Sequence, residues 1–486
     1  MLKNPLPEVK NVLPGLAIAS HGLQGASPAL QSALHIAAAG LPDGLTHPDR
    51  ALTDIIHAAI DAGGGWIGFD TFMALALYTP GLGYYANGST KFGVLPADAL
   101  RERGRQGDAA HCSGDISGSS RSSGSGSGRR NGVVESGSDR GRNSGVIGLE
   151  FGEGSDFATA PEMTPLFGQT LATQVAQALQ ATHTAEVWEF GAGSGALALQ
   201  ILDELARLKV PLARYTVVDL SGSLRARQQQ RLQAHADTVR WVDALPDQMQ
   251  GVVLGNEVLD AMPVKLLARK NGVWFERGVA LANADDAITL AWADRPTHLR
   301  PPIDVPGAHD YLTEIHPQAE AFIRTLADRL TVGAAFFLDY GFPEGEYYHP
   351  QRHMGTVMCH RQHRADANPL ADVGRKDITA HVNFTGIAVA AQEAGLDVLG
   401  YCTQARFLMN CGLLERLEAA SFAEKIMAQK LILEHEMGEL FKVIGFCKPR
   451  GANASVENVA ETVDVAQMGE PWQPIGFAQG DRTHTL

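Results

Sequence analysis

The fold is decided by one stretch of the chain, Val187-Trp188-Glu189-Phe190-Gly191-Ala192-Gly193-Ser194-Gly195-Ala196. Residues 187–190 are apolar apart from one acid, which predicts a short buried strand. The apolar spacing over 196–208 predicts a helix. The glycines between them allow a tight turn and a close approach by a ligand, and the start of a helix offers unpaired backbone N–H groups. The stretch therefore predicts a ligand-binding turn between a strand and a helix.

Short apolar runs and helical patterns alternate on both sides of this turn. We expect helices at 51–62, 67–78, 224–234, 314–330 and 386–394. We expect strands at 215–219, 239–242, 251–255, 334–339, 378–381 and 398–403, and a hairpin of strands 265–270 and 273–279 around Asn271-Gly272. Alternating strands and helices predict an α/β fold with a doubly wound, mostly parallel sheet.

Three acids bear on which cofactor the turn would bind. Glu189 precedes the first glycine by two positions, Asp219 ends the next expected strand, and Asp243 ends the one after. A carboxylate at 189 attracts a cationic amino group and repels a pyrophosphate. Asp219 is placed to accept hydrogen bonds from ribose hydroxyls, and Asp243 lies where an adenine would sit. The charges favour S-adenosylmethionine over NAD, although the glycines also fit a dinucleotide fingerprint and an empty structural turn remains open.

Composition narrows the function classes. The 486 residues carry a net charge of −14, which argues against a nucleic-acid partner held by bulk electrostatics. The five cysteines are scattered, so neither a disulfide framework nor a metal site is expected. Histidines 363 and 381 are candidates for acid–base work, with packed histidines as the alternative. No long apolar run predicts a membrane span, and the N-terminus fits neither a signal nor a transit peptide, so we expect a cytoplasmic protein.

We expect five regions along the chain. A loose arm covers 1–50, and an N-terminal helical part of the catalytic unit covers 51–100. A Gly/Ser/Arg-rich insertion follows at 101–148, where almost no apolar residues are available to offset the entropy of ordering. The main α/β domain covers 149–450, and a polar, loose tail covers 451–486.

Several ordered blocks resemble the MidA-like methyltransferases, whose mitochondrial member is an arginine methyltransferase needed for assembly of respiratory complex I. The resemblance covers about Thr53 to Lys448. Besides the glycine turn, its blocks are Tyr78-Thr79-Pro80-Gly81-Leu82-Gly83-Tyr84-Tyr85, Gly154-Ser155-Asp156-Phe157-Ala158-Thr159-Ala160-Pro161-Glu162, Val218-Asp219-Leu220-Ser221, Gly255-Asn256-Glu257-Val258-Leu259-Asp260-Ala261-Met262-Pro263-Val264, Leu338-Asp339-Tyr340-Gly341, 355–364 and 377–384.

The resemblance implies a class I, Rossmann-like methyltransferase with a seven-stranded, mostly parallel sheet, an N-terminal helical extension and inserted substrate-side elements. It implies S-adenosylmethionine as cofactor and an arginine side chain of a protein, such as a complex I subunit, as acceptor; a homodimer is left open. The expected cofactor residues are Glu189, Gly191, Ala192, Gly193, Gly195, Asp219, Leu220, Asp243, Thr159, Pro161 and Glu162.

An arginine acceptor needs its own chemistry. A carboxylate pair can hold a guanidinium through two hydrogen bonds and localise its charge. Glu257 and Asp260 follow a strand at the carboxyl edge of the sheet and are the expected catalytic pair, with Asn256 positioning the acceptor.

Two features depart from the family pattern. The 101–148 insertion falls where relatives run straight through, and Asn383 stands where an acid is expected. They keep a second hypothesis open, an assembly or binding factor with residual S-adenosylmethionine affinity; an NAD-dependent oxidoreductase is the third.

Overall fold

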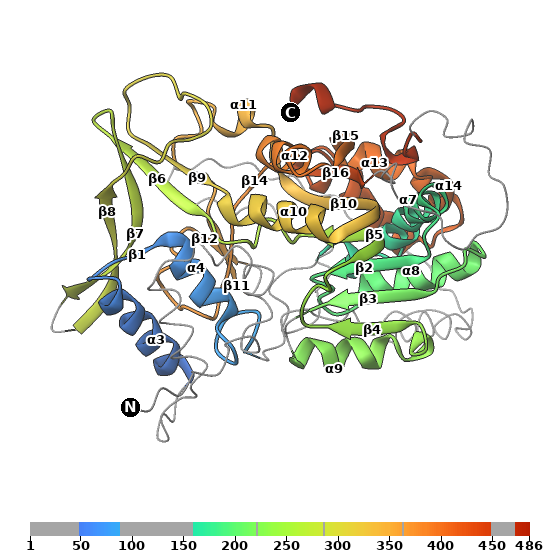
Figure 1. Ribbon diagram of the computed structural model, residues 1–486, viewed down its shortest axis with the longest axis horizontal. Helices are drawn as coiled ribbons and strands as arrows, with labels where there is room; N and C mark the ends of the chain where they lie inside the picture. Colours follow the sequence, from blue (N-terminus) through green and yellow to red (C-terminus); the bar gives the residue numbers. More distant parts are fainter. Residues whose placement is uncertain (1–47, 88–158, 220–221, 285–286, 362–363, 449–471) are drawn as a thin grey trace, which may run out of the picture.

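The computed structural model describes residues 48–87, 159–219, 222–284, 287–361, 364–448 and 472–486 (Figure 1). Residues 1–47 of the predicted arm, the whole 101–148 insertion, Leu220 and position 363 lie outside the described residues. Within the described part, two large sheets stand side by side, each with its own helices (Figure 1).

The larger sheet is mixed and has eight strands in the order β15-β16-β10-β5-β2-β3-β4, with β14 paired to β10. Strand β16 is antiparallel to both neighbours, and the remaining pairs are parallel. The seven-stranded sheet expected from the resemblance is thus replaced by an eight-stranded one in the described chain. The strands are β2 (Glu186–Phe190), β3 (Arg214–Val218), β4 (Val239–Val242), β5 (Met249–Asn256), β10 (Leu330–Phe342), β14 (Val382–Asn383), β15 (Asp397–Thr403) and β16 (Phe441–Lys448).

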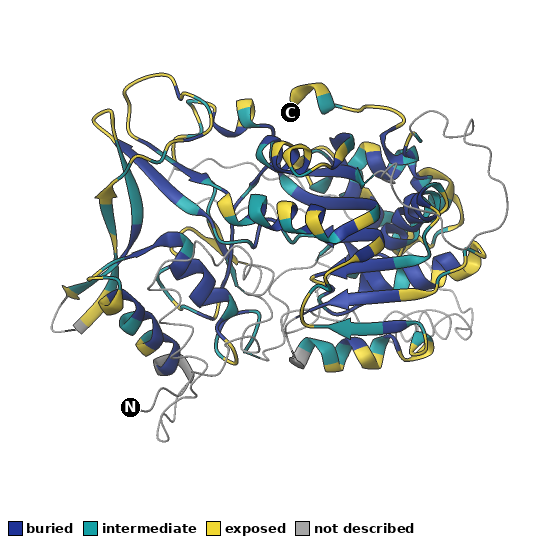
Figure 2. Cartoon of the chain, viewed as in Figure 1, coloured by how far each residue is buried: buried dark blue, intermediate teal, exposed yellow. Residues whose placement is uncertain are grey.

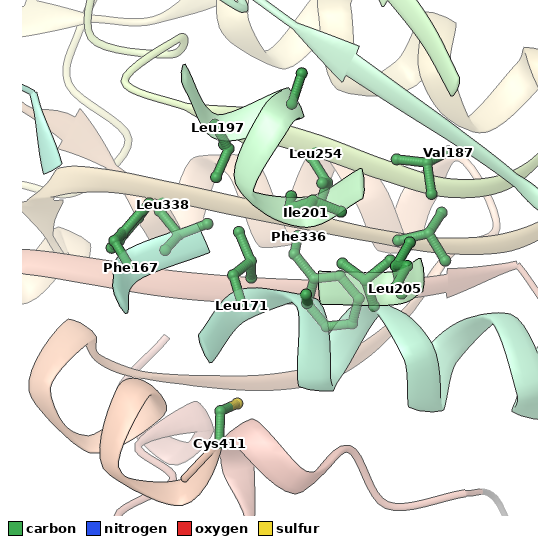
Figure 3. Close-up of a cluster of buried hydrophobic side chains, with 14 of the residues drawn as sticks. Phe167, Leu171, Val187, Leu197, Ile201, Leu205, Leu254, Phe336, Leu338 and Cys411 are labelled. Carbon is green, nitrogen blue, oxygen red and sulfur yellow. The ribbon is translucent and has the colours of Figure 1, made fainter. Parts of the chain in front are cut away.

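Helices cover both faces of this sheet, because successive strand residues point to opposite sides. Val187, Leu254 and Phe336 pack against helices α7 (Leu166–Thr182) and α8 (Ala196–Arg207), as Figure 3 shows. Their chain neighbours, such as Trp188 and Phe337, pack on the other face, where α10 (Pro317–Arg329) and α12 (Phe384–Glu393) lie. The central strands are buried over most of their length (Figure 2). This is the doubly wound arrangement that the alternating pattern predicts.

The smaller sheet is antiparallel and holds five strands, with β1-β7-β6-β9 in order and β8 paired to β7. It packs with helices α3 (Pro48–Ala62) and α4 (Phe69–Tyr78) around a second core. Its strands are β1 (Ile67–Gly68), β6 (Lys265–Lys270), β7 (Val273–Ala284), β8 (Ala287–Pro296) and β9 (Tyr311–Ile315). The predicted hairpin is confirmed, although β7 runs further than expected and β8 extends it.

The other elements connect these two bodies or flank the larger sheet. A three-stranded sheet in the order β12-β11-β13 lies between them. The remaining elements are α6 (Ala160–Met163), α9 (Gly222–Arg231), η2 (Gln233–His235), α11 (Glu344–Tyr347), β11 (Met358–Arg361), β12 (Arg364–Asp366), β13 (Asp377–Thr379), α13 (Gln404–Asn410), α14 (Leu413–Ala419), α15 (Phe422–Ile432), α16 (Met437–Leu440), η4 (Ile475–Phe477) and η5 (Thr483–Thr485).

Two predicted helices begin later than expected. The helix expected at 314–330 begins at Pro317, because residues up to Ile315 belong to β9. The helix expected at 67–78 begins at Phe69, because Ile67 and Gly68 pair with β7. In both cases tertiary strand pairing takes residues that the helical pattern alone would include.

The C-terminal residues are packed, which corrects the loose tail expected over 451–486 for its described part. Phe477 is 6% exposed and lies against Phe336 and Phe407. The backbone N–H groups of Ile475 and Gly476 donate to Gln177 and Gln174 of α7. One buried aromatic side chain and two backbone hydrogen bonds hold this polar segment on the core. The average composition of the segment does not show this, because only one of its side chains is a large buried ring.

Replacing Phe477 by alanine is expected to lower the free energy of unfolding by about 3 kcal/mol, because it opens a cavity among buried aromatic rings. Denaturant unfolding measures this. Phe422→Ala is the matched control, since Phe422 is 80% exposed and its loss should change stability by about 0.5 kcal/mol or less. Equal effects of the two substitutions would contradict the packing of the C-terminal segment.

Candidate active site

The glycine turn after β2 has the backbone that its sequence predicts. Gly191, Gly193 and Gly195 have φ of 61°, 53° and 82°, a region that side-chain-bearing residues rarely adopt. A Cβ at Gly191 would lie 3.1 Å from Val258 Cγ2. Gly195 precedes α8 without any side-chain cap, so backbone N–H groups at the start of the helix remain available to a ligand.

Glu189 and Asp219 flank this turn from neighbouring strand ends, and both are buried. The Tyr215 hydroxyl donates to Glu189 at 2.7 Å. Burial raises the pKa of Glu189 to about 8, against the lowering effect of the Tyr215 hydrogen bond. A buried carboxyl group with a raised pKa gains from a cationic partner, because the partner restores the ionised form. Both acids lie beside the glycine turn, and their roles toward a cofactor stay a prediction.

The third predicted acid lies apart from the other two. Asp243 is 57% exposed and forms an ion pair with Arg225. The same arginine donates to the backbone carbonyl of Asp219. Asp243 therefore lies at the surface, and Arg225 links it to the backbone of Asp219.

The predicted Thr159–Glu162 block forms α6 and lies against the glycine turn. Thr159 precedes the helix, and the Pro161 carbonyl accepts from Gln200 of α8 at 2.7 Å. Glu162 is hydrogen-bonded to Ser194 of the turn and forms an ion pair with Arg231 at 3.0 Å. The block therefore joins the glycine turn to α9.

The loop after β5 carries the predicted acceptor residues. Glu257 has φ of 53°, an unusual value for a residue with a side chain, and backbone strain of this kind is concentrated at functional sites. The amide of Asn256 donates to Glu257 at 3.0 Å, and the backbone of Ala160 in α6 also hydrogen-bonds to it. Burial, followed by the charge of Asp260, raises the pKa of Glu257 to about 8. The two parts of the site thus meet at α6.

Asp260 completes the predicted pair. It is 4% exposed and accepts a hydrogen bond from the Tyr340 hydroxyl. Burial raises its pKa to about 6. The negative charge of Asp260 disfavours ionisation of Glu257 beside it.

From the sequence, Asp339 is expected only as a member of a family block. Its hydrogen bonds to the loop after β5 were not predicted. One oxygen of Asp339 accepts from the backbone N–H groups of Val258, Leu259 and Asp260, at 3.2, 2.9 and 3.2 Å. Its other oxygen accepts from the backbone of Tyr340 at 2.9 Å. This carboxyl group fixes the loop that carries Glu257 and Asp260, and its position at the end of the strand expected at 334–339 was the available signal.

A fourth acid and two tyrosines from the family blocks also belong to this cluster. Tyr85 donates its hydroxyl to Asp377 at 2.8 Å, and Tyr78 donates to the carbonyl of Ala261 at 2.8 Å. The two rings stack with centroids 5.6 Å apart. Both tyrosines belong to the family block at 78–85. The smaller body, which includes α4, therefore contributes side chains that contact the loop after β5 and Asp377.

Two acceptor atoms in this cluster have no partner among the described residues: Asn256 Oδ1 and Asp260 Oδ1, both buried. Burying polar atoms without a hydrogen bond costs free energy, so such atoms mark a place for a donor. Four acids and no described cation partner for Glu257 or Asp260 favour a ligand that is cationic and rich in N–H donors. The described part of the chain contains no group of three or more His, Cys, Asp or Glu side chains that could hold a metal ion.

Asn383, the departure from the family pattern, begins a helix. Its side chain accepts from the backbone N–H of Gly386 at the start of α12. Asparagine and aspartate serve equally well at this position of a helix. His381 lies nearby in packed surroundings, between the rings of Tyr340 and Phe342, and burial lowers its pKa to about 4.

Curated relatives share part of the chain. It is 25% identical over 295 residues to "Protein arginine methyltransferase NDUFAF7 homolog, mitochondrial" of Caenorhabditis elegans, covering 55% of this chain and 67% of that protein. It is 25% identical over 330 residues to "Protein arginine methyltransferase NDUFAF7, mitochondrial" of Danio rerio, covering 60% and 76%. These relatives are mitochondrial by name, so the cytoplasmic location expected from the N-terminus is corrected. No helix within the described residues is long and apolar enough to span a membrane.

Family and structural comparisons agree with each other. Residues 170–402 match a family described as "Putative S-adenosyl-L-methionine-dependent methyltransferase". A crystal structure of a COG1565 superfamily member from Burkholderia thailandensis, bound to S-adenosyl-homocysteine, is 42% identical and has a TM-score of 0.70, with 92% of this chain and 99% of that chain covered. A native structure of a COG1565 superfamily protein from the same organism is 40% identical, with a TM-score of 0.68. The chain therefore belongs to the COG1565 superfamily of S-adenosyl-L-methionine-dependent methyltransferases.

Proposed function

We propose that this methyltransferase is a protein arginine N-methyltransferase that acts on a respiratory complex I subunit or a related protein. The observation that carries the proposal is the acid pair of half-buried Glu257 and buried Asp260, with the partnerless acceptors Asn256 Oδ1 and Asp260 Oδ1 beside it. The names of the curated relatives supply the acceptor class.

The residues around the glycine turn fit S-adenosylmethionine as cofactor. Glycines with positive φ leave the turn without side chains, and the uncapped start of α8 offers backbone donors. Glu189 would bind the amino group of the methionine part, and Asp219 the ribose hydroxyls. Gly191, Ala192, Gly193 and Gly195 would form the turn around it. Bound there, the cofactor supplies an electrophilic methyl group on its sulfonium.

Thr159, Pro161, Glu162 and Asp243 have supporting roles in this proposal. Glu162 is already bonded to Ser194 and Arg231, so it holds the turn. Asp243, exposed and paired with Arg225, would act at the adenine end through that arginine. Leu220 stays a prediction, as does the homodimer.

The acceptor end suits a guanidinium better than an ammonium. A guanidinium is planar and always charged, and its paired N–H groups match two carboxylates or a carboxylate and an amide oxygen. Glu257 and Asp260 would hold it and draw its positive charge toward themselves, which leaves the far nitrogen more nucleophilic. That nitrogen loses a proton when it gains a methyl group, and a carboxyl group with a raised pKa is suited to receive it.

Mass spectrometry of complex I subunits, from the host with and without this protein, tests the acceptor. We expect a methylated arginine that disappears without the protein and does not return with a Glu257→Gln variant. Methylation of a small molecule alone, with every subunit unchanged, would contradict the proposal.

A further inference from the structure

Gln228 of α9 is fully buried and bonds to three separate parts of the cofactor region. Its amide nitrogen donates to the carbonyl of Gly193 at 2.9 Å and to Asp219 Oδ2 at 2.6 Å. Its amide oxygen accepts from the indole N–H of Trp241 at 2.9 Å. One side chain thus joins the glycine turn, the end of β3 and strand β4.

The chemistry of the partners fixes the orientation of this amide. An indole N–H can only donate, whereas a carbonyl and a carboxylate can only accept. Rotating the amide by half a turn would set its NH₂ against the indole and its oxygen against two acceptors. Both amide hydrogens and the oxygen are therefore used in a single arrangement, and Asp219 Oδ2 is held in place relative to Gly193.

We propose that Gln228 is a positioning residue for cofactor binding, which sets the Asp219 carboxylate and the glycine turn in register with each other. The inference rests on the proposed cofactor role of Asp219. The sequence does not distinguish Gln228 from Gln229 and Gln230, which follow it directly. In the structure Gln228 is buried, whereas the other two glutamines are exposed.

Two arginines on the same helix support this role. Arg225 and Arg231 lie three residues before and after Gln228, and such a spacing places side chains on one helix face. Arg225 donates to the carbonyl of Asp219 at 3.1 Å, and Arg231 pairs with Glu162 at 3.0 Å. Three side chains on this face of α9 therefore contact the cofactor region. Gln228 is the middle one of the three and the most buried.

Calorimetry with S-adenosyl-homocysteine on the full chain tests the proposal, with Gln228→Met, Gln228→Glu and the control Gln229→Met. For Gln228→Met we expect Kd to rise about tenfold, the cost of losing hydrogen bonds to a charged group. The KM for S-adenosylmethionine should rise similarly, while kcat at saturation changes less than about threefold. Gln229→Met should bind like the unchanged protein.

The Gln228→Glu variant adds a readout that a purely structural role would not move. A carboxylate there faces Asp219 and the Gly193 carbonyl, so like charges repel; protonation removes the repulsion and restores one donor. The ratio of its Kd to that of the unchanged protein should therefore fall as pH is lowered from 8 to 6. This variant keeps the length and shape of glutamine, so it serves also if Gln228→Met does not fold.

Asp219→Ala, measured in parallel, distinguishes a failure of the proposed cofactor site from a failure of the proposed role of Gln228. If Asp219→Ala leaves binding unchanged, the proposed cofactor site is wrong. If Asp219→Ala weakens binding but the Gln228 variants bind normally and are only less stable, the site stands and the inference about Gln228 is overturned.

Discussion

Replacing Glu257 by glutamine is expected to lower kcat for methyl transfer to an arginine-containing protein by about 10²–10³-fold, the usual size for the loss of one preorganised electrostatic group. The substitution keeps the shape and the contact with Asn256 but removes the charge that would hold and polarise a guanidinium. Because Glu257 lies beyond the glycine turn, the Kd for S-adenosyl-homocysteine should change less than about threefold.

The pH profile gives the same prediction an independent readout. Burial and Asp260 raise the pKa of Glu257 to about 8, so near neutral pH much of it is protonated and unable to hold a cation. Guanidinium keeps its charge throughout this range. With the cofactor saturating, kcat/KM for the acceptor should therefore increase as pH rises toward about 8 and then level off.

The Glu257→Gln variant should lose that rising limb, since it has no group to ionise at 257. Glu418→Gln is the control, because Glu418 is exposed on α14. An unchanged kcat in Glu257→Gln, or a rising limb that survives the substitution, would show that Glu257 does not bind the acceptor.

Replacing Asp339 by alanine is expected to lower the free energy of unfolding by about 3 kcal/mol and to abolish most of the activity. Four backbone N–H groups, those of residues 258, 259, 260 and 340, would lose their acceptor inside the protein. A buried donor left without a partner costs about 1–3 kcal/mol. The loop that carries Glu257 and Asp260 would also lose its anchor, so kcat should fall in the fraction that remains folded.

Asp339→Asn should be intermediate, because it keeps one carbonyl oxygen but turns an NH₂ group toward backbone donors. Denaturant unfolding and initial rates measure the series. Asp328→Ala is the control on exposed α10 surface and should change stability by about 0.5 kcal/mol or less. If Asp339→Ala matches that control, the loop is not anchored by Asp339.

Much of the larger sheet could be predicted from the sequence, because apolar runs and glycine turns are local patterns. The strand–turn–helix at 187–208 and the strands at 239–242 and 251–255 follow from apolar runs and glycines, and the structure confirms them within about two residues. Strands β8, β9 and β16 were missed. β8 is half-buried or exposed and pairs with the neighbouring β7, whereas β9 and β16 are largely buried and pair with β6 and β10, which are distant in the sequence.

The candidate site divides in the same way. Glu189, Asp219 and Glu257 could be found because each directly follows or ends a strand at the same sheet edge. Gln228 and Asp377 could not be placed, because their partners lie on other elements of the fold. Asp243 stays a prediction: it follows β4, and its exposed side chain pairs with Arg225.

We propose that this methyltransferase modifies arginine through Glu257 and Asp260. The most direct measurement incubates the full chain with methyl-labelled S-adenosylmethionine and complex I subunits, hydrolyses the protein and separates the amino acids. Label in methylated arginine, absent when Glu257→Gln replaces the unchanged protein, is the predicted result. Label in another amino acid, or label in methylated arginine that the Glu257→Gln variant produces equally well, would contradict it.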